Sequence, residues 1–165
     1  QKFLGINRHA YWPMHFTSVV GDISKIKIGI GAAPGLSPGC YIQGNGSLDI
    51  GDYTIVGPNV GIITANHDIH DISKHKPLFV KIGKYCWVGM NSVILPGVVL
   101  GDHTVVAAGA IVTTSFPDGY VVIGGNPAKK IKDIDPIKCV EKKSVYEYVG
   151  YVPVDKFPEF QLLFL

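Results

Sequence analysis

The chain of 165 residues has little charge, few cysteines and no long apolar run. Charged residues make up 17% of it, and 15 basic against 13 acidic side chains leave a formal net charge of +2. A charge this small and scattered excludes the basic footprint of a nucleic-acid-binding protein. No apolar run approaches the roughly 20 residues of a membrane-spanning helix, and no charged-then-apolar leader precedes the first repeat. We therefore expect neither a nucleic-acid partner nor a membrane span.

Cysteine is too scarce for a disulfide framework. The three cysteines, Cys40, Cys86 and Cys139, are odd in number and form no CxxC pair, which also excludes a cysteine-based zinc site. Reduced thiols of this kind are typical of a cytoplasmic protein, and we expect that location. Hydrophobic residues make up 47% of the chain, enough for a sizeable core, and the length predicts one domain over residues 1–165.

A six-residue repeat is the strongest pattern in the sequence. Aliphatic side chains return at every sixth position of its clearest stretch: Ile82, Val88, Ile94, Leu100, Val106 and Val112. The next residue is mostly small, as in Gly83 and Gly89, and we assign these residues to sharp corners. The period, together with 20 glycines and 11 prolines, excludes long helices, and it is too short for the strands of a sandwich. It predicts an all-β fold, a parallel β-helix whose coils stack their aliphatic residues, without giving its handedness.

The repeat is interrupted once. We expect coils over residues 20–63 and 82–132, with an excursion loop over 64–81 between them. Within the loop the letters ANHDIHD bring together two histidines and two aspartates. Long excursions from a compact fold are more often functional than accidental. Asp68 and Asp71 either orient a neighbouring imidazole or simply form turns.

The two ends do not follow the repeat. Residues 1–19 are rich in aromatic and histidine side chains, and we expect them to cap the first coil. Residues 133–165 are expected to form a short helix and a tail, because Asp135 and Pro136 are a good N-cap and first-turn pair for a helix through IKCVEKK. The tail beyond it is aromatic and ends apolar, so we expect it to pack on a neighbouring subunit.

The loop, the repeat and the segment after it resemble a known family. The pieces are TANHDIHD, the repeat over 82–117 and the closing VVIGGNPAKKIKDID, and they cover roughly residues 40–135. The chain is similar to the hexapeptide-repeat acyltransferases, closest to the maltose and galactoside O-acetyltransferases and the capsule-polysaccharide and xenobiotic acetyltransferases. The resemblance implies a left-handed β-helix that forms closed homotrimers with active sites between subunits. It also implies an acetyl-CoA-dependent O-acetyltransferase acting on a hydroxyl of a sugar or saccharide precursor, such as a precursor of capsule or cell-surface polysaccharide.

In this family a loop histidine, which His67 matches, is the general base. Acyl transfer from a thioester to a hydroxyl needs a base of near-neutral pKa beside the hydroxyl. A thioester is already activated, so no covalent enzyme intermediate is required. The resemblance therefore implies direct transfer, with His67 removing the proton. His70 is a candidate for substrate contact, although loop composition alone also explains it.

The resemblance places the acetyl-CoA cosubstrate along the coils. Ala108 and Thr113 match positions beside the CoA arm, where small residues allow close approach to the main chain. Trp87 matches a tryptophan that lines the cleft for CoA and acceptor, with packing on a neighbouring chain as its alternative. The N–H of Met90 is a candidate oxyanion donor, although the family has Ser or Gly at this position.

Charged and polar positions complete the implied site. Lys129 and Lys130 match basic residues that meet the CoA phosphates, and a solvated edge is their alternative reading. Asn45, flanked by glycines, stands where maltose-type relatives carry an aspartate toward the sugar. It can bind a sugar hydroxyl, or it can serve as an ordinary turn residue.

Two other function classes remain open from the sequence. The γ-type carbonic anhydrases hold zinc between left-handed β-helices through three histidines, two of them five residues apart, and His70 and His75 have this spacing. They lie in the excursion rather than in the coils, so we expect no metal. A catalytically silent assembly module is the second alternative, because fold does not imply function.

Overall fold

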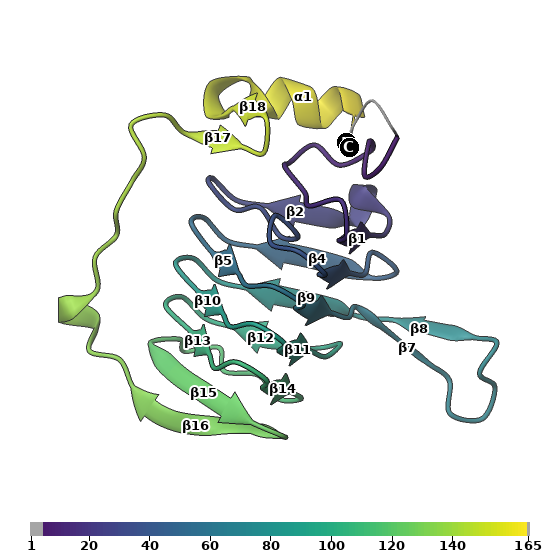
Figure 1. The fold of residues 1–165 in the computed structure, drawn as a ribbon, viewed down its shortest axis with the longest axis vertical. Helices are drawn as coiled ribbons and strands as arrows, with labels where there is room; N and C mark the ends of the chain where they lie inside the picture. The colour runs from purple at the N-terminus through teal and green to yellow at the C-terminus, as the bar shows by residue number, and fades with distance from the viewer. Residues whose placement is uncertain (1–4, 165) are drawn as a thin grey trace.

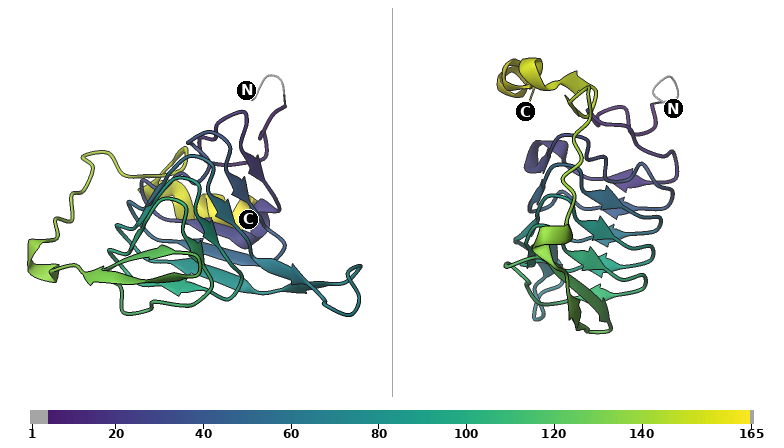
Figure 2. Two further views of the ribbon diagram at one scale, coloured as in Figure 1. Left: turned by 60° about the horizontal axis from the view of Figure 1, so that its bottom comes forward. Right: turned by 90° about the vertical axis from the view of Figure 1, so that its left-hand side faces the viewer.

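The structure is a computed structural model that describes residues 5–164, so the first four residues of the expected N-terminal cap lie outside the described residues. It forms a stack of coils with three flat faces, seen from the side in Figure 1 and tilted toward its end in the left view of Figure 2. After the last coil the chain runs back along one edge of the stack (Figure 1). A two-stranded ribbon, formed by residues 65–77, projects from the opposite side of the stack (Figure 1).

Three mainly parallel sheets form the faces. The first sheet contains β1 (Val19–Val20), β3 (Tyr41–Ile42), β6 (Gly61–Ile62), β11 (Val93–Ile94) and β14 (Ile111–Val112). The second contains β2 (Ile26–Ile28), β4 (Ser47–Ile50), β9 (Phe79–Ile82) and β12 (Val99–Leu100). The third contains β5 (Ile55–Val56), β10 (Trp87–Val88), β13 (Val105–Val106), β15 (Val121–Gly125) and β16 (Ala128–Asp133).

Neighbouring coils stack in register, so every sixth residue points into one core. Val88 pairs with Val56 of the coil before it and with Val106 of the coil after it. The aliphatic residues of the repeat are all 6% exposed or less: Ile50, Val56, Ile62, Ile82, Val88, Ile94, Leu100, Val106 and Val112. The predicted parallel β-helix is confirmed, and burial of these side chains is its main stabilising contribution.

The corners are turned by residues other than those expected. A positive φ occurs on the third residue after seven of these nine buried aliphatics: Tyr53, Asn59, Tyr85, Asn91, Gly97, His103 and Gly109. Gly83, expected at a corner, instead lies against the next coil, where a Cβ would come within 2.6 Å of the Asp102 nitrogen. Where the residue after an aliphatic is glycine, as at Gly51, Gly83 and Gly101, it is small because neighbouring backbones approach closely there.

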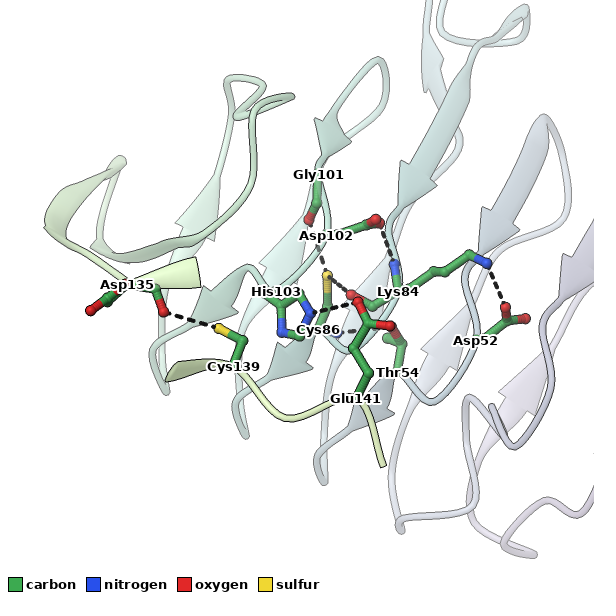
Figure 3. Close-up of polar contacts among 10 residues, drawn as sticks. All are labelled: Asp52, Thr54, Lys84, Cys86, Gly101, Asp102, His103, Asp135, Cys139 and Glu141. Carbon is green, nitrogen blue, oxygen red and sulfur yellow. Dashed lines mark hydrogen bonds and ion pairs between the residues drawn. The ribbon is translucent and has the colours of Figure 1, made fainter. Parts of the chain in front are cut away.

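One corner carries a column of stacked rings. Tyr53 stacks on Tyr85 with ring centroids 5.3 Å apart, and Tyr85 stacks on His103 at 5.2 Å. The returning chain covers this column, because the Tyr53 hydroxyl donates to Glu147 Oε1 at 2.8 Å. Glu141 lies on the same side, 3.7 Å from His103 Nε2 (Figure 3).

The excursion is shorter than the expected loop over 64–81, and it is an ordered ribbon. Strands β7 (Ala65–His67) and β8 (His75–Pro77) pair antiparallel. Phe79 already lies in β9, opposite Ser47 of β4. The return comes early because residues 79–82 alternate in burial, with Val80 and Ile82 pointing into the core.

The coils also end earlier than the expected residue 132. Strand β16 turns back and pairs antiparallel with β15, so the stack closes with a hairpin. Three lysines and an aspartate on β16 leave a charged outer edge, which discourages further strand pairing. The helix expected through IKCVEKK is one 3₁₀ turn, η3 (Pro136–Lys138), whose N-cap Asp135 accepts from the Ile137 N–H as expected.

The C-terminal tail packs on the first coil of its own chain, and its exposed Leu162 and Leu163 leave packing on a neighbouring subunit as a prediction. It contains β17 (Tyr148–Val149), β18 (Val152–Pro153), the 3₁₀ turn η4 (Val154–Lys156) and α1 (Phe157–Phe164). Phe157 and Phe160 lie 5.9 and 5.7 Å from the ring of Tyr11. The Tyr11 hydroxyl donates to the carbonyl of Ile26 at 3.2 Å, directly after the 3₁₀ turn η2 (Ile23–Lys25). Figure 1 shows α1 above β2, so the aromatic ends of the chain close the top of the stack together.

Candidate active site

The ribbon carries His67 at the end of β7. Its Nδ1 lies 2.6 Å from the carbonyl oxygen of Ile72, and its ring centroid lies 4.4 Å from that of His75 on the opposite strand. A carbonyl oxygen only accepts hydrogen bonds, so Nδ1 carries the proton. In the neutral imidazole this leaves the lone pair on Nε2, where it can accept a proton from a bound group.

The two aspartates of the ribbon form turns. Asp68 accepts from the N–H groups of His70 and Asp71 at 2.8 and 3.2 Å, and it pairs with Lys76 at 2.6 Å. The hydrogen bond from Lys76 holds the pKa of the Asp68 carboxyl below its usual value. The Ser73 hydroxyl does the same for the pKa of Asp71. These contacts favour the turn-forming reading over the orientation of an imidazole.

A groove on the outer face of the third sheet brings three of the expected donor residues together. Trp87, Met90 and Ala108 line a hollow of about 340 Å³, with small neighbours at Gly57, Gly89 and Ala107. Trp87 is 57% exposed on the outer face beside the groove, in register with Ile55 of the coil before it and Val105 of the coil after it. Gly89 is required there, because a Cβ would come within 2.6 Å of the Val106 oxygen.

The remaining donor residues lie outside this groove. Thr113 is exposed just after β14, on the first sheet. Lys129 and Lys130 lie on β16 at the closed end of the third sheet. Lys130 is held by Asp133, with its Nζ 2.6 Å from the carboxylate, whereas Lys129 is exposed and appears in none of the ion pairs found over residues 5–164.

The expected acceptor residue lies beside the base of the ribbon. Asn45 is exposed in the connection between β3 and β4, and its neighbour Gly46 donates its N–H to Thr64 Oγ1 at 2.9 Å. A Cβ on Gly46 would come within 2.4 Å of the Thr64 oxygen, so only glycine allows this contact. The glycine after Asn45 is therefore needed for packing against the ribbon, beyond an ordinary turn.

One chain does not bring the two halves of the site together. The ribbon leaves the corner between β6 of the first sheet and β9 of the second. The groove lies on the third sheet, over β10 and β13. His67 and Asn45 thus share one corner, while Trp87, Met90 and Ala108 share another face.

Two further properties bear on the other function classes. Over residues 5–164 no group of three or more His, Cys, Asp or Glu side chains is placed to hold a metal ion. His70 and His75 are therefore not joined by a third ligand within the described part of one chain. No helix among these residues has the length and apolar character to cross a membrane.

Known proteins resemble the chain in sequence and structure. Residues 79–114 match the family described as bacterial transferase hexapeptide (six repeats). A galactoside O-acetyltransferase of Escherichia coli (strain K12) is 36% identical over 93 residues, covering 54% of this chain and 45% of that protein. A maltose O-acetyltransferase structure from Clostridium difficile 630 is 31% identical, with a TM-score of 0.56, covering 72% of this chain and 60% of that one. A galactoside acetyltransferase in complex with coenzyme A is 28% identical, with a TM-score of 0.65, covering 81% and 67%.

These matches confirm the resemblance to the hexapeptide-repeat acetyltransferases of the galactoside and maltose type. The fold is their left-handed parallel β-helix. The chain spans about half the length of the curated relatives it matches, so their activity is not simply carried over to it.

Proposed function

We propose that the chain is an acetyl-CoA-dependent O-acetyltransferase that acts on a hydroxyl group of a sugar or saccharide precursor. The observation that carries the proposal is the contact between His67 Nδ1 and the Ile72 carbonyl, because it leaves Nε2 free as a base. Similarity to galactoside and maltose O-acetyltransferases supports the acetyl group and the saccharide class. The coenzyme A bound in a similar structure supports the cosubstrate.

The reaction is a direct transfer. Nε2 of His67 takes the proton of the acceptor hydroxyl while the hydroxyl oxygen attacks the thioester carbonyl. The main-chain N–H of Met90 faces the developing oxyanion and stabilises it. Collapse of the tetrahedral intermediate forms the ester and breaks the C–S bond, and the proton held by His67 passes to the departing thiolate. The products are an O-acetyl saccharide and free coenzyme A.

The groove of Trp87, Met90 and Ala108 binds the pantetheine arm. Its lining is apolar and its small residues allow the arm to lie against the main chain. Lys129 and Lys130 serve the CoA phosphates, with Lys129 the better placed because Asp133 already neutralises Lys130. Thr113 lies beside the arm on the neighbouring face.

The active site lies between copies of the chain in a homotrimer. The ribbon is exposed, with Ile69 and Ile72 at 85% and 78%, and an isolated two-stranded ribbon is only marginally stable in water. A neighbouring copy covers these apolar side chains and supplies the groove that the ribbon's own chain holds on another face. His70 and Asn45 then contact the acceptor from the ribbon side, and Trp87 from the groove side.

The biological setting is also a proposal. We infer a single acyltransferase domain in the cytoplasm that acetylates a precursor of capsule or other cell-surface polysaccharide. The small-molecule saccharide acceptor would be modified before its assembly into polymer.

The test is an acetyl-transfer assay. Wild-type protein is incubated with acetyl-CoA and, separately, methyl β-galactoside, maltose and glucosamine, and both thiol release and product mass are recorded. We expect an O-acetyl product that disappears in His67→Ala and persists in Lys142→Ala, an exposed position remote from the ribbon. Equal turnover by wild type and His67→Ala contradicts the assignment of the base, and acetylation of the glucosamine amine alone contradicts O-transfer.

A further inference from the structure

The chain leaves the coil stack at Thr64, and its main-chain pairing changes there. In the first sheet the strands before the last one are followed by a residue whose N–H donates to the next coil: Gln43 to Ile62, and Ile63 to Ile94. Thr64 and Ala65 come next and turn out into the ribbon, where no following coil offers them a carbonyl. Buried N–H groups without an acceptor are costly, so another acceptor must replace the missing one.

The side chain of Gln43 supplies that acceptor. Its Oε1 accepts from the Thr64 N–H at 2.9 Å and from the Ala65 N–H at 2.8 Å. Two donors converge on this one atom, so it is the amide oxygen and not the nitrogen. The Thr64 hydroxyl closes the connection by donating to the main-chain oxygen of Gln43 at 3.2 Å.

The same contacts tie the ribbon to the connection that carries Asn45. Gly46 donates to Thr64 Oγ1, and Leu78, where the ribbon returns, donates to the Thr64 oxygen at 2.8 Å. His67 lies only two residues beyond Ala65. The direction in which the ribbon leaves the stack, and with it the position of the imidazole, is therefore set at Gln43.

We propose that Gln43 is a positioning residue that fixes the ribbon, and through it His67, relative to the acceptor-side residue Asn45. This inference rests on the proposed function for its catalytic consequence, but the structural part can be tested without activity. Gln43 itself touches no reacting atom. Its contribution is to hold the base within reach of the acceptor hydroxyl, where small displacements have large effects on rate.

Hydrogen exchange followed by mass spectrometry tests the structural part. Gln43→Ala should raise the exchange rate of residues 64–67 at least tenfold, while Gln43→Glu, whose carboxylate still accepts both N–H groups, should stay close to wild type. Thr54→Val is the matched control: Thr54 donates to Gly83 and accepts from Cys86 at a different corner, so exchange should rise there only. Unchanged exchange at 64–67 in Gln43→Ala overturns the inference whatever the protein catalyses.

Steady-state kinetics test the catalytic part. With methyl β-galactoside or maltose, Gln43→Ala should lower kcat roughly tenfold or more while KM for acetyl-CoA stays within about twofold, because the donor groove lies on another sheet. Gln43→Glu should restore kcat. A looser ribbon with an unchanged kcat overturns the positioning role. Absence of turnover in wild type would instead count against the proposed function. Hydrogen exchange would then still test whether Gln43 fixes the ribbon.

Discussion

The imidazole of His67 is held by the main-chain carbonyl of Ile72, five residues further along the same ribbon, with 2.6 Å between Nδ1 and the oxygen. Asp68 and Asp71 close the turn that makes this contact possible, because their carboxylates accept hydrogen bonds from main-chain N–H groups of the turn. The ribbon thus orients its own histidine before any substrate or second copy arrives.

This contact predicts the tautomer of His67. Long-range ¹H–¹⁵N correlation at pH 8.5 should show the proton on Nδ1 and a free Nε2, because the carbonyl oxygen can only accept. Exposed His70, whose ring has no such carbonyl partner among the contacts found within 5–164, serves as the comparison and should favour Nε2–H. A proton on Nε2 of His67 would remove the basis for its role as the base.

Filling the donor groove should abolish acetyl-CoA binding without unfolding the chain. Ala108→Trp places a large ring in the hollow beside Trp87. Calorimetric titration should show binding to wild type and at least a hundredfold weaker binding to this variant. Ile137→Trp introduces the same side chain at a site that is 94% exposed and outside the groove, and it should bind normally. Equal loss in both variants would mean that the groove is not the donor site.

The two lysines of β16 should differ in their effect on acetyl-CoA. Both lysines are exposed, but Lys130 is paired with Asp133, whereas Lys129 is in none of the ion pairs found over residues 5–164. Lys129→Ala should therefore weaken acetyl-CoA binding about fivefold, and Lys130→Ala less than twofold. The loss in Lys129→Ala should shrink as salt is raised, because phosphate contacts are screened. The reverse order of the two variants would place the phosphates near Lys130 instead.

Removing one inward side chain should weaken the whole coil stack. Ile94 is fully buried between the coils, so Ile94→Ala should cost about 3 kcal/mol of unfolding free energy from lost burial and the cavity left behind. Ile137→Ala, at its exposed position, should change it by less than about 0.5 kcal/mol. Denaturant unfolding at a fixed protein concentration measures both. Equal losses of unfolding free energy in the two variants would contradict a core shared by the coils.

Burial makes Cys86 inert. It raises the pKa of the Cys86 thiol from 9.0 to about 11, so at pH 8 about one thiol in a thousand is ionised. Ellman's reagent should label half-buried Cys139 and leave Cys86 unlabelled in the folded protein. Since the folded thiol keeps its proton to higher pH than the unfolded one, stability should fall as pH rises from 9 to 11, and Cys86→Ala should reduce that fall. Rapid labelling of Cys86 would contradict its burial.

The six-residue period predicted the coils because each period places one aliphatic residue inward, as Val88 and Ile94 show. It did not predict which residue turns each corner. Tyr53, Tyr85 and His103 adopt a positive φ that side chains of this size seldom take, and only their shared spacing within the repeat could have signalled it. The helix expected after Asp135 stops after one turn, and the chain then continues along the aromatic column, where Glu141 lies beside His103 and Glu147 accepts from Tyr53.

Only some residues of the candidate site could be predicted from the sequence. His67, Trp87, Met90 and Ala108 were predicted through the family resemblance, and the last three line one groove. Gln43 and Gly46 escaped notice because their partners lie about twenty residues away, across a pairing that only the fold reveals. The ribbon itself was expected as a loop, since its strands are short and carry no alternation of burial.

Subunit complementation tests the central claim most directly, namely that the ribbon of one copy meets the groove of another. His67→Ala and Ala108→Trp should each be inactive alone in acetyl transfer. When the two are unfolded, mixed in equal amounts and refolded together, about a quarter of the sites in random trimers should combine an intact ribbon with an intact groove, restoring about a quarter of wild-type activity. A mixture that refolds into trimers but stays inactive would place the whole site within one chain and contradict the account.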